Sequence, residues 1–178
     1  MQHLNRNIGR SFSRDIVATV DQLLFGLTLF AALGCGLMAG VFFAFSAFVM
    51  KALARLPPGE GIAAMQSINV VVLNLSFMVA FFGTAAACVL ALVSSLLRWH
   101  APGAAYLLVG SALYLVGCLL VTIVFNVPRN ESLASIAPTD ADGASLWDNY
   151  VASWTAWNHV RTAAALAAAA SFSVALSY

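Results

Sequence analysis

The chain has 178 residues, of which 62% are hydrophobic and only 8% are charged, and its formal net charge is +1. A soluble domain carries roughly 25% charged residues and could not cover its surface with so few. This composition excludes an ordinary soluble fold, and the near-zero charge argues against a nucleic-acid partner. We therefore expect a single all-α integral membrane domain spanning residues 1–178.

The first predicted membrane helix covers about residues 22–50. Residues 23–50 carry no charge, and Arg6, Arg10 and Arg14 precede them, which mimics a secretory signal peptide. The apolar run is longer than a signal-peptide core of about 7–15 residues. We therefore expect a retained helix, which ends before Pro57-Pro58-Gly59.

Two further helices are predicted over about residues 62–97 and 104–126. Both lie in charge-free runs long enough to cross a hydrocarbon core of about 30 Å. The first of them is long enough to begin as an interfacial helix before it crosses the membrane. We expect the other to end at Pro128, because proline lacks an amide donor and restricts the residue before it.

A polar stretch, residues 131–149, predicts an extramembrane loop before a fourth helix over about residues 147–177. Four crossings form an up-down four-helix bundle with both termini on one side of the membrane. Lysines and arginines divide evenly between the two sides, so the positive-inside rule barely decides the orientation. The three arginines before the first helix favour cytoplasmic termini.

Polar and aromatic residues gather at the helix ends that would meet on the side away from the termini. Because an α-helix turns by about 100° per residue, the aromatic and polar positions of residues 147–161 form one stripe. Amides near lipid are costly unless they face inward and pair, so these residues are candidates for a ligand pocket. The candidates are Ser46, Gln66, Asn69, Asn126, Asn130, Trp147, Tyr150, Trp154, Trp157, Asn158 and Arg161.

Two structural explanations compete with a pocket. Tryptophan, tyrosine and arginine are ordinary anchors at the membrane interface, and the amides could simply join helices by hydrogen bonds. His159 is the histidine nearest the stripe but lies roughly 150° from its centre in a regular helix. Cys35, Cys88 and Cys118 lie in three separate apolar runs and are interpreted as core residues. We expect no metal site.

Several motifs resemble the anthrone oxygenase-like membrane family over roughly residues 25–171. The motif on the fourth predicted helix is the most specific, and the others are moderately specific. They are Phe43-Ala44-Phe45-Ser46, Ala64-Met65-Gln66-Ser67-Ile68-Asn69, Asn126-Val127-Pro128-Arg129-Asn130 and Trp147-x-x-Tyr150-x-x-x-Trp154-Thr155-x-Trp157-Asn158-His159-Val160-Arg161-Thr162.

The resemblance implies a small four-helix membrane protein that oxidises a hydrophobic phenolic or polyketide substrate with O2, without metal, flavin or other cofactor. Asn158, His159 and Arg161 would then be catalytic, and Ser46, Gln66, Asn69, Asn126, Asn130, Tyr150, Trp154 and Trp157 would bind substrate. The tryptophans suit stacking, the asparagines suit hydrogen bonds to an oxyanion, and Arg161 suits charge stabilisation. His159 has the pKa range of a base, but its helical phase argues against it.

Two non-enzymatic alternatives remain open: a membrane protein that binds a small molecule, and a subunit of a larger assembly or homo-oligomer. Small residues at Gly103, Gly110 and Gly117 would favour assembly if they are exposed. A transporter is disfavoured because the apolar runs contain no acidic residue and the sequence shows no repeat. The expected partners are therefore a hydrophobic small molecule, O2 and membrane lipid.

Overall fold

The computed structural model describes residues 2–139 and 142–178 of the chain. The all-α prediction is confirmed, because every regular element in these residues is helical. Three short stretches have the wider π-helical geometry, which often marks functional sites. The elements are α1 (Gln2–Ala44), η1 (Phe45–Val49), α2 (Met50–Leu53), α3 (Pro58–Val71), α4 (Leu75–Leu97), α5 (Ala104–Tyr114), η2 (Leu115–Leu120), η3 (Thr122–Asn126), α6 (Val127–Ala134) and α7 (Gly143–Ala175).

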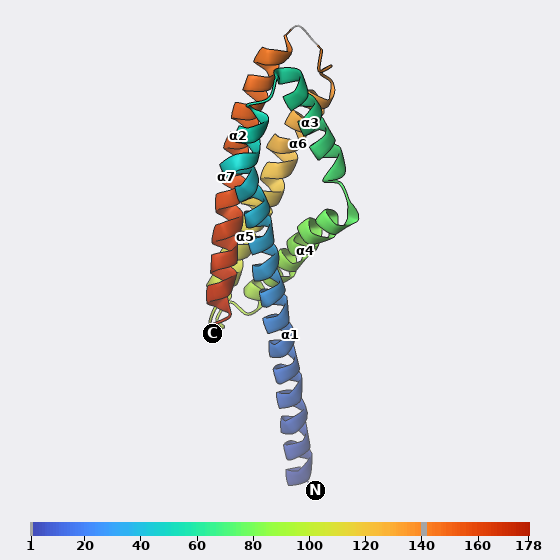
Figure 1. The fold of residues 1–178 in the computed structure, drawn as a ribbon. Coiled ribbons are helices and arrows are strands. Elements are labelled where there is room, and N and C mark those ends of the chain that lie inside the picture. Colours follow the sequence, from blue (N-terminus) through green and yellow to red (C-terminus); the bar gives the residue numbers. More distant parts are fainter. Residues whose placement is uncertain (1, 140–141) are drawn as a thin grey trace.

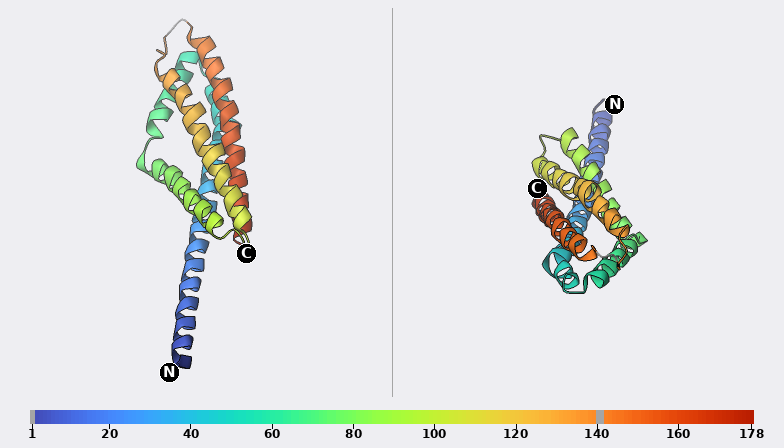
Figure 2. Two further views of the ribbon diagram at one scale, coloured as in Figure 1. Left: turned by 180° about the vertical axis from the view of Figure 1, so that it is seen from behind. Right: turned by 90° about the horizontal axis from the view of Figure 1, so that it is seen from above.

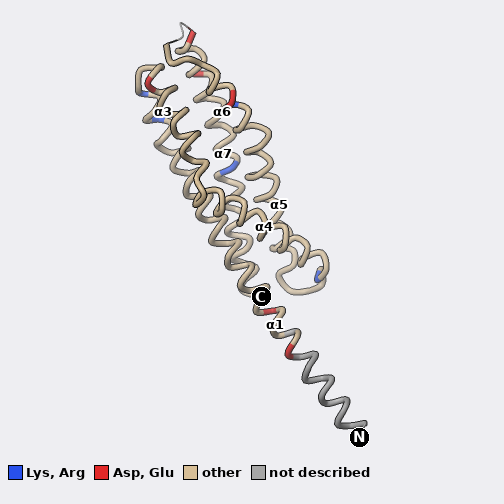
Figure 3. The backbone as a smooth tube through the Cα atoms, turned by 90° about the vertical axis from the view of Figure 1, so that its right-hand side faces the viewer, with Lys and Arg blue, Asp and Glu red and all other residues tan. Residues whose placement is uncertain are grey.

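The chain passes up and down along a common axis (Figure 1). Helix α1 rises to α2, α3 and α4 descend, α5 to α6 rises again, and α7 descends beside α1. The N-terminal part of α1 projects well beyond the other helices, and the C-terminus lies at the same lower end (Figures 1 and 2). Figure 3 shows that acidic and basic residues lie mostly near the two ends, with one basic position on α7 as an exception between them.

Three helical segments in the described residues are long and apolar enough to cross a membrane: Ala18–Leu53, Leu75–Leu97 and Ala104–Ala134. They fall within or overlap three of the four predicted helices, which supports a membrane protein. Helix α7 is not among them, although it is 33 residues long. Its alanines are less hydrophobic than leucine or valine, and Asn158, His159 and Arg161 lie in its centre.

The predicted helix over residues 62–97 is two helices, α3 and α4, which meet at a change of direction (Figure 1). Asn74 makes the break: its side chain accepts a hydrogen bond from the Phe77 amide at 3.0 Å and donates one to the Val71 carbonyl at 3.0 Å. Asparagine is a preferred residue at a helix N-cap because it satisfies an amide that has no helical partner. The long apolar run thus contains its own helix-start signal.

The prediction that helix three ends at Pro128 is wrong. The helix continues through η2 and η3 into α6, and Pro128 lies in the first turn of α6. Proline is tolerated at this position because the amide it lacks would have no partner at a helix start. The π-helical segment η3 ends directly before α6, so the hydrogen-bond pattern already changes where proline enters.

Small residues allow α5 and its continuation to pack closely on α7. A Cβ atom added at Gly117 would lie 2.5 Å from the Ala164 Cβ, and one added at Gly110 would lie 3.1 Å from the Phe172 ring. Gly103 instead has a positive φ of 80° in the turn before α5. Gly110 and Gly117 therefore face α7 inside the fold, and Gly103 serves the turn, so none of the three supports the assembly alternative.

Candidate binding site around Arg161

Arg161 of α7 is buried in the upper half of the bundle, with 5% of its surface exposed. Its Nη2 donates to the Asn158 Oδ1 at 2.6 Å, and its Nη1 donates to the Thr122 Oγ1 at 3.2 Å. The guanidinium also lies over the Phe42 ring at 4.3 Å and the Trp154 ring at 5.1 Å. Neutral polar groups and aromatic faces therefore surround this cation.

No carboxylate neutralises Arg161 within the part of the chain that the structure describes. The ion pair found there joins Arg98 and Asp21, at the other end of the bundle. The Nε of Arg161 is buried and has no hydrogen-bond partner. A buried, unpaired cation is costly, and a free donor on that cation is suited to an anionic or strongly polar ligand.

Asn158 holds Arg161 in place with a side chain whose nitrogen and oxygen atoms are both hydrogen-bonded. Its Nδ2 donates to the Phe42 carbonyl and to the Ser46 Oγ, both at 2.7 Å, while its Oδ1 accepts from Arg161. Ser46 also lies 3.4 Å from the Thr162 hydroxyl. Asn158 is completely buried, so it connects α1 and η1 to the guanidinium and has no donor left for a ligand.

A second group of polar residues lies above this one, around Trp154. The Asn130 Oδ1 accepts hydrogen bonds from the Tyr150 hydroxyl at 2.9 Å and the Trp154 Nε1 at 2.8 Å. The Asn126 Nδ2 donates to the Trp154 carbonyl at 3.3 Å. The Oδ1 of Asn126 is buried without a partner, so the free atom of Asn126 is an acceptor.

Residues of α3 complete the upper group. The Nδ2 atom of Asn69 is buried and makes no hydrogen bond. Gln66 has a different role, because its Nε2 donates to the Leu133 and Ile136 carbonyls, both at 2.9 Å. These carbonyls lie at and just beyond the C-terminal end of α6, so Gln66 ties α3 to the end of α6.

Two predicted site residues lie apart from the group. Trp157 is half-buried and stacks on Phe125, with ring centroids 3.5 Å apart and planes 7° apart. His159 is exposed on the opposite side of α7. The structure therefore does not bring the predicted base to Arg161, and the reason is the helical phase, which turns position 159 away from positions 154, 158 and 161.

Thr122 and Phe42 both contact Arg161, although neither was predicted from the sequence to belong to the site. Thr122 precedes Asn126 by four residues, which is the spacing that places two side chains on one helix face. Ser46, Thr122 and Asn126 all lie in π-helical segments. Such segments often occur at functional sites.

The unpartnered atoms define what a ligand could contact at this site. The Arg161 Nε and the Asn69 Nδ2 are free donors, and the Asn126 Oδ1 is a free acceptor. Two hollows of the described residues lie elsewhere, one at the lower end of the bundle and one beside Asp15 and Val20 of α1. The three free atoms are buried, so a ligand would reach them by moving side chains.

Comparison with known proteins identifies the family. The family model described as anthrone oxygenase matches residues 76–171, which is more than half of the chain. The match includes α4 and the polar residues of η3, α6 and α7, whereas the motifs around Ser46 and Gln66 lie outside it. Neither a search of curated proteins nor a search of solved structures gave a match. On the evidence of this match, the chain belongs to the anthrone oxygenase family.

Proposed function

We propose that the protein oxidises a hydrophobic phenolic or polyketide substrate with O2 at the site around Arg161, and that it needs no cofactor. It does so as a four-helix protein of the bacterial inner membrane, in which α7 is the fourth crossing and both termini are cytoplasmic. The family match supports this proposal. The single observation that carries it is the buried guanidinium of Arg161, which no carboxylate of the described residues neutralises.

The chemistry requires an anionic substrate. A methylene group between aromatic rings, opposite a carbonyl across the same ring, loses a proton to give a phenolate-like carbanion. This anion can pass one electron to O2, and the resulting radical and superoxide combine to a peroxide. Loss of water from the peroxide leaves a carbonyl, so that CH2 and O2 become C=O and H2O. Both the anion and superoxide carry a negative charge, which Arg161 would stabilise.

The free atoms assign different roles to the three asparagines. Asn158 has no free donor, because both its N–H groups are bonded to Phe42 and Ser46. Asn69 has a free donor that can support an oxyanion, as can the Arg161 Nε. Asn126 offers an acceptor, so it would bind a protonated hydroxyl group of the substrate. The site is thus suited to a ligand that has an oxyanion and a hydroxyl group.

A non-enzymatic binding protein is the second candidate, and one observation favours it. The reaction begins with proton removal, yet His159 is exposed on the far side of α7. The hydrogen bonds found around Arg161 in the described residues involve neutral groups of asparagine, serine and threonine. A binder needs the cation but no base, so binding without turnover is the signature of this alternative.

The test uses the purified protein in detergent with an anthrone and O2. The enzyme proposal predicts consumption of one O2 per anthraquinone formed, in the wild type and not in Arg161→Met. Binding of the anthrone, measured by quenching of tryptophan fluorescence, without O2 consumption would favour the binding protein. Neither binding nor turnover would refute both candidates for this substrate class.

A further inference from the structure

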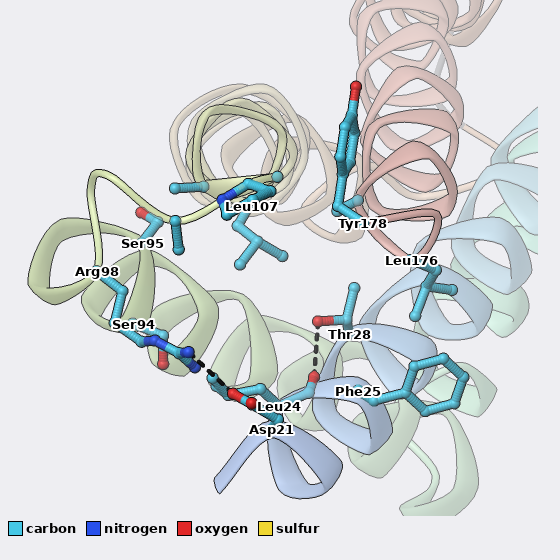
Figure 4. A pocket seen from close by; sticks show the side chains of 15 residues that line it. Asp21, Leu24, Phe25, Thr28, Ser94, Ser95, Arg98, Leu107, Leu176 and Tyr178 are labelled. Atoms are coloured by element: carbon cyan, nitrogen blue, oxygen red, sulfur yellow. Dashed lines mark hydrogen bonds and ion pairs between the residues drawn. The ribbon is translucent and has the colours of Figure 1, made fainter. Parts of the chain in front are cut away.

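The lower end of the bundle contains a hollow of about 400 Å³, far from the Arg161 site (Figure 4). Small-molecule sites have volumes of roughly 300–1,000 Å³, so this hollow has room for a ligand. Four parts of the chain form its walls: α1, the end of α4, the turn before α5, and the C-terminal residues after α7. Its lining combines apolar groups, such as Leu24, Leu107 and Leu176, with the pair formed by Asp21 and Arg98.

The hollow lies where the apolar segments end. The candidate span Leu75–Leu97 stops beside it and Ala104–Ala134 starts beside it. Aromatic residues typical of a membrane interface lie at the same level: Trp99 is 52% exposed, and Tyr106 stacks on Tyr178 with ring centroids 5.8 Å apart. In a membrane the mouth of the hollow would therefore face lipid headgroups.

The charges at the hollow are balanced and only partly used. The Arg98 Nη2 donates to the Asp21 Oδ1 at 2.9 Å, and both side chains are about half exposed. The other guanidinium nitrogens and the second carboxylate oxygen make no further hydrogen bond in the described residues. A cation and an anion side by side favour a zwitterionic ligand, which has one positive and one negative group, over a purely anionic ligand.

We propose that this hollow binds a phospholipid with a zwitterionic headgroup and a primary ammonium, as in phosphatidylethanolamine. The phosphate contacts Arg98, and the ammonium donates to Asp21. An acyl chain occupies the apolar interior beside Leu24 and Leu107. Phosphatidylcholine fits less well, because its quaternary ammonium has no N–H to donate, and phosphatidylglycerol leaves Asp21 beside a second negative group.

The experiment reconstitutes the protein in nanodiscs with equal amounts of phosphatidylethanolamine, phosphatidylglycerol and phosphatidylcholine, and detects retained lipid by native mass spectrometry after mild detergent release. The wild type should retain one phosphatidylethanolamine, enriched about fivefold, because partly exposed ionic contacts are worth about 1 kcal/mol. Arg98→Ala and Asp21→Asn should lose the enrichment. Arg55→Ala is the matched control, since Arg55 is exposed at the opposite end of the bundle.

A third variant tests the hollow without changing its charges. Ser94 lines the hollow, so Ser94→Trp should fill it and displace the lipid, while its melting temperature reports whether the fold is kept. Equal retention of the three lipids by the wild type would overturn the proposal, as would a preference for phosphatidylglycerol. Unchanged enrichment in Ser94→Trp, or in both charge variants, would also overturn it.

Discussion

Replacement of Arg161 by methionine should remove function with little loss of stability, and this outcome distinguishes a ligand-binding residue from a structural one. Methionine fills a similar long, unbranched volume between the Phe42 and Trp154 rings without bringing a charge into the interior. The wild-type arginine is buried with a free Nε and no carboxylate partner in the described residues. Such an arrangement is expected to be expensive for the free protein.

The magnitude follows from the contacts that change. The variant loses the bonds from Arg161 to Asn158 and Thr122, and a hydrogen bond to a charged group contributes about 1.5–3 kcal/mol. It also removes the desolvation penalty of the guanidinium, which is several kcal/mol. These two effects oppose each other, so the free energy of unfolding should stay within about 2 kcal/mol of the wild type.

Unfolding of the detergent-solubilised protein by SDS measures this free energy, and anthrone binding measures the site. We expect near-wild-type unfolding together with loss of binding and of O2 consumption. A loss of more than about 3 kcal/mol, the value typical of a broken buried ion pair, would show that Arg161 holds the fold together. That result would refute the assignment of its charge to a ligand.

Four further predictions concern neighbouring features of the structure. Asn158→Leu should destabilise the fold by about 3 kcal/mol, because it removes the bonds to the Phe42 carbonyl and the Ser46 hydroxyl and strands the Arg161 Nη2. The same SDS titration would detect this loss, and a wild-type curve would contradict the prediction. In the wild type, Asn126 supplies a free acceptor for a ligand hydroxyl group. Asn126→Leu should therefore lower the ratio of the affinity for a hydroxylated ligand to the affinity for its methyl ether by about tenfold, as measured by fluorescence titration. Gly117→Ala should destabilise the fold by about 1–3 kcal/mol because its Cβ would collide with Ala164, whereas Gly36→Ala, with open space around it, should not. His159→Ala should leave binding and O2 consumption unchanged, because the side chain is exposed, and a large drop in turnover would place the base there after all.

The stripe on the fourth helix illustrates how far helical phase alone can go. Positions 147, 150, 154, 157, 158 and 161 were placed on one face by their spacing, and five of the six are buried in the structure, whereas Trp157 is only half-buried. The same reasoning placed His159 away from that face, and it is exposed. Phase works here because α7 is a regular α-helix over 33 residues, so each residue advances by the same angle.

Predictions that depended on regular helices throughout the chain were less successful. The run over residues 62–97 contains a break that depends on one asparagine cap, which an apolar count does not detect. Pro128 indicated a helix end, yet the chain continues because a π-helical segment precedes the proline. π-helical segments are rare, so a regular α-helix is what a sequence pattern predicts.

Composition, charge-free runs and helical period thus determined from the sequence that the chain is all-α, that it has membrane-like helices, and which residues of the last helix face inward. Only the tertiary structure decided which polar atoms are already paired. Asn126 and Asn158 are the same residue type, yet the Oδ1 of Asn126 has no partner, whereas both the Nδ2 and the Oδ1 of Asn158 are hydrogen-bonded. The physical reason is that a change of a few tenths of an ångström in the distance between two helices decides whether a hydrogen bond forms. The residues that such bonds join are 28 to 116 positions apart in the chain, and no local pattern specifies their distance.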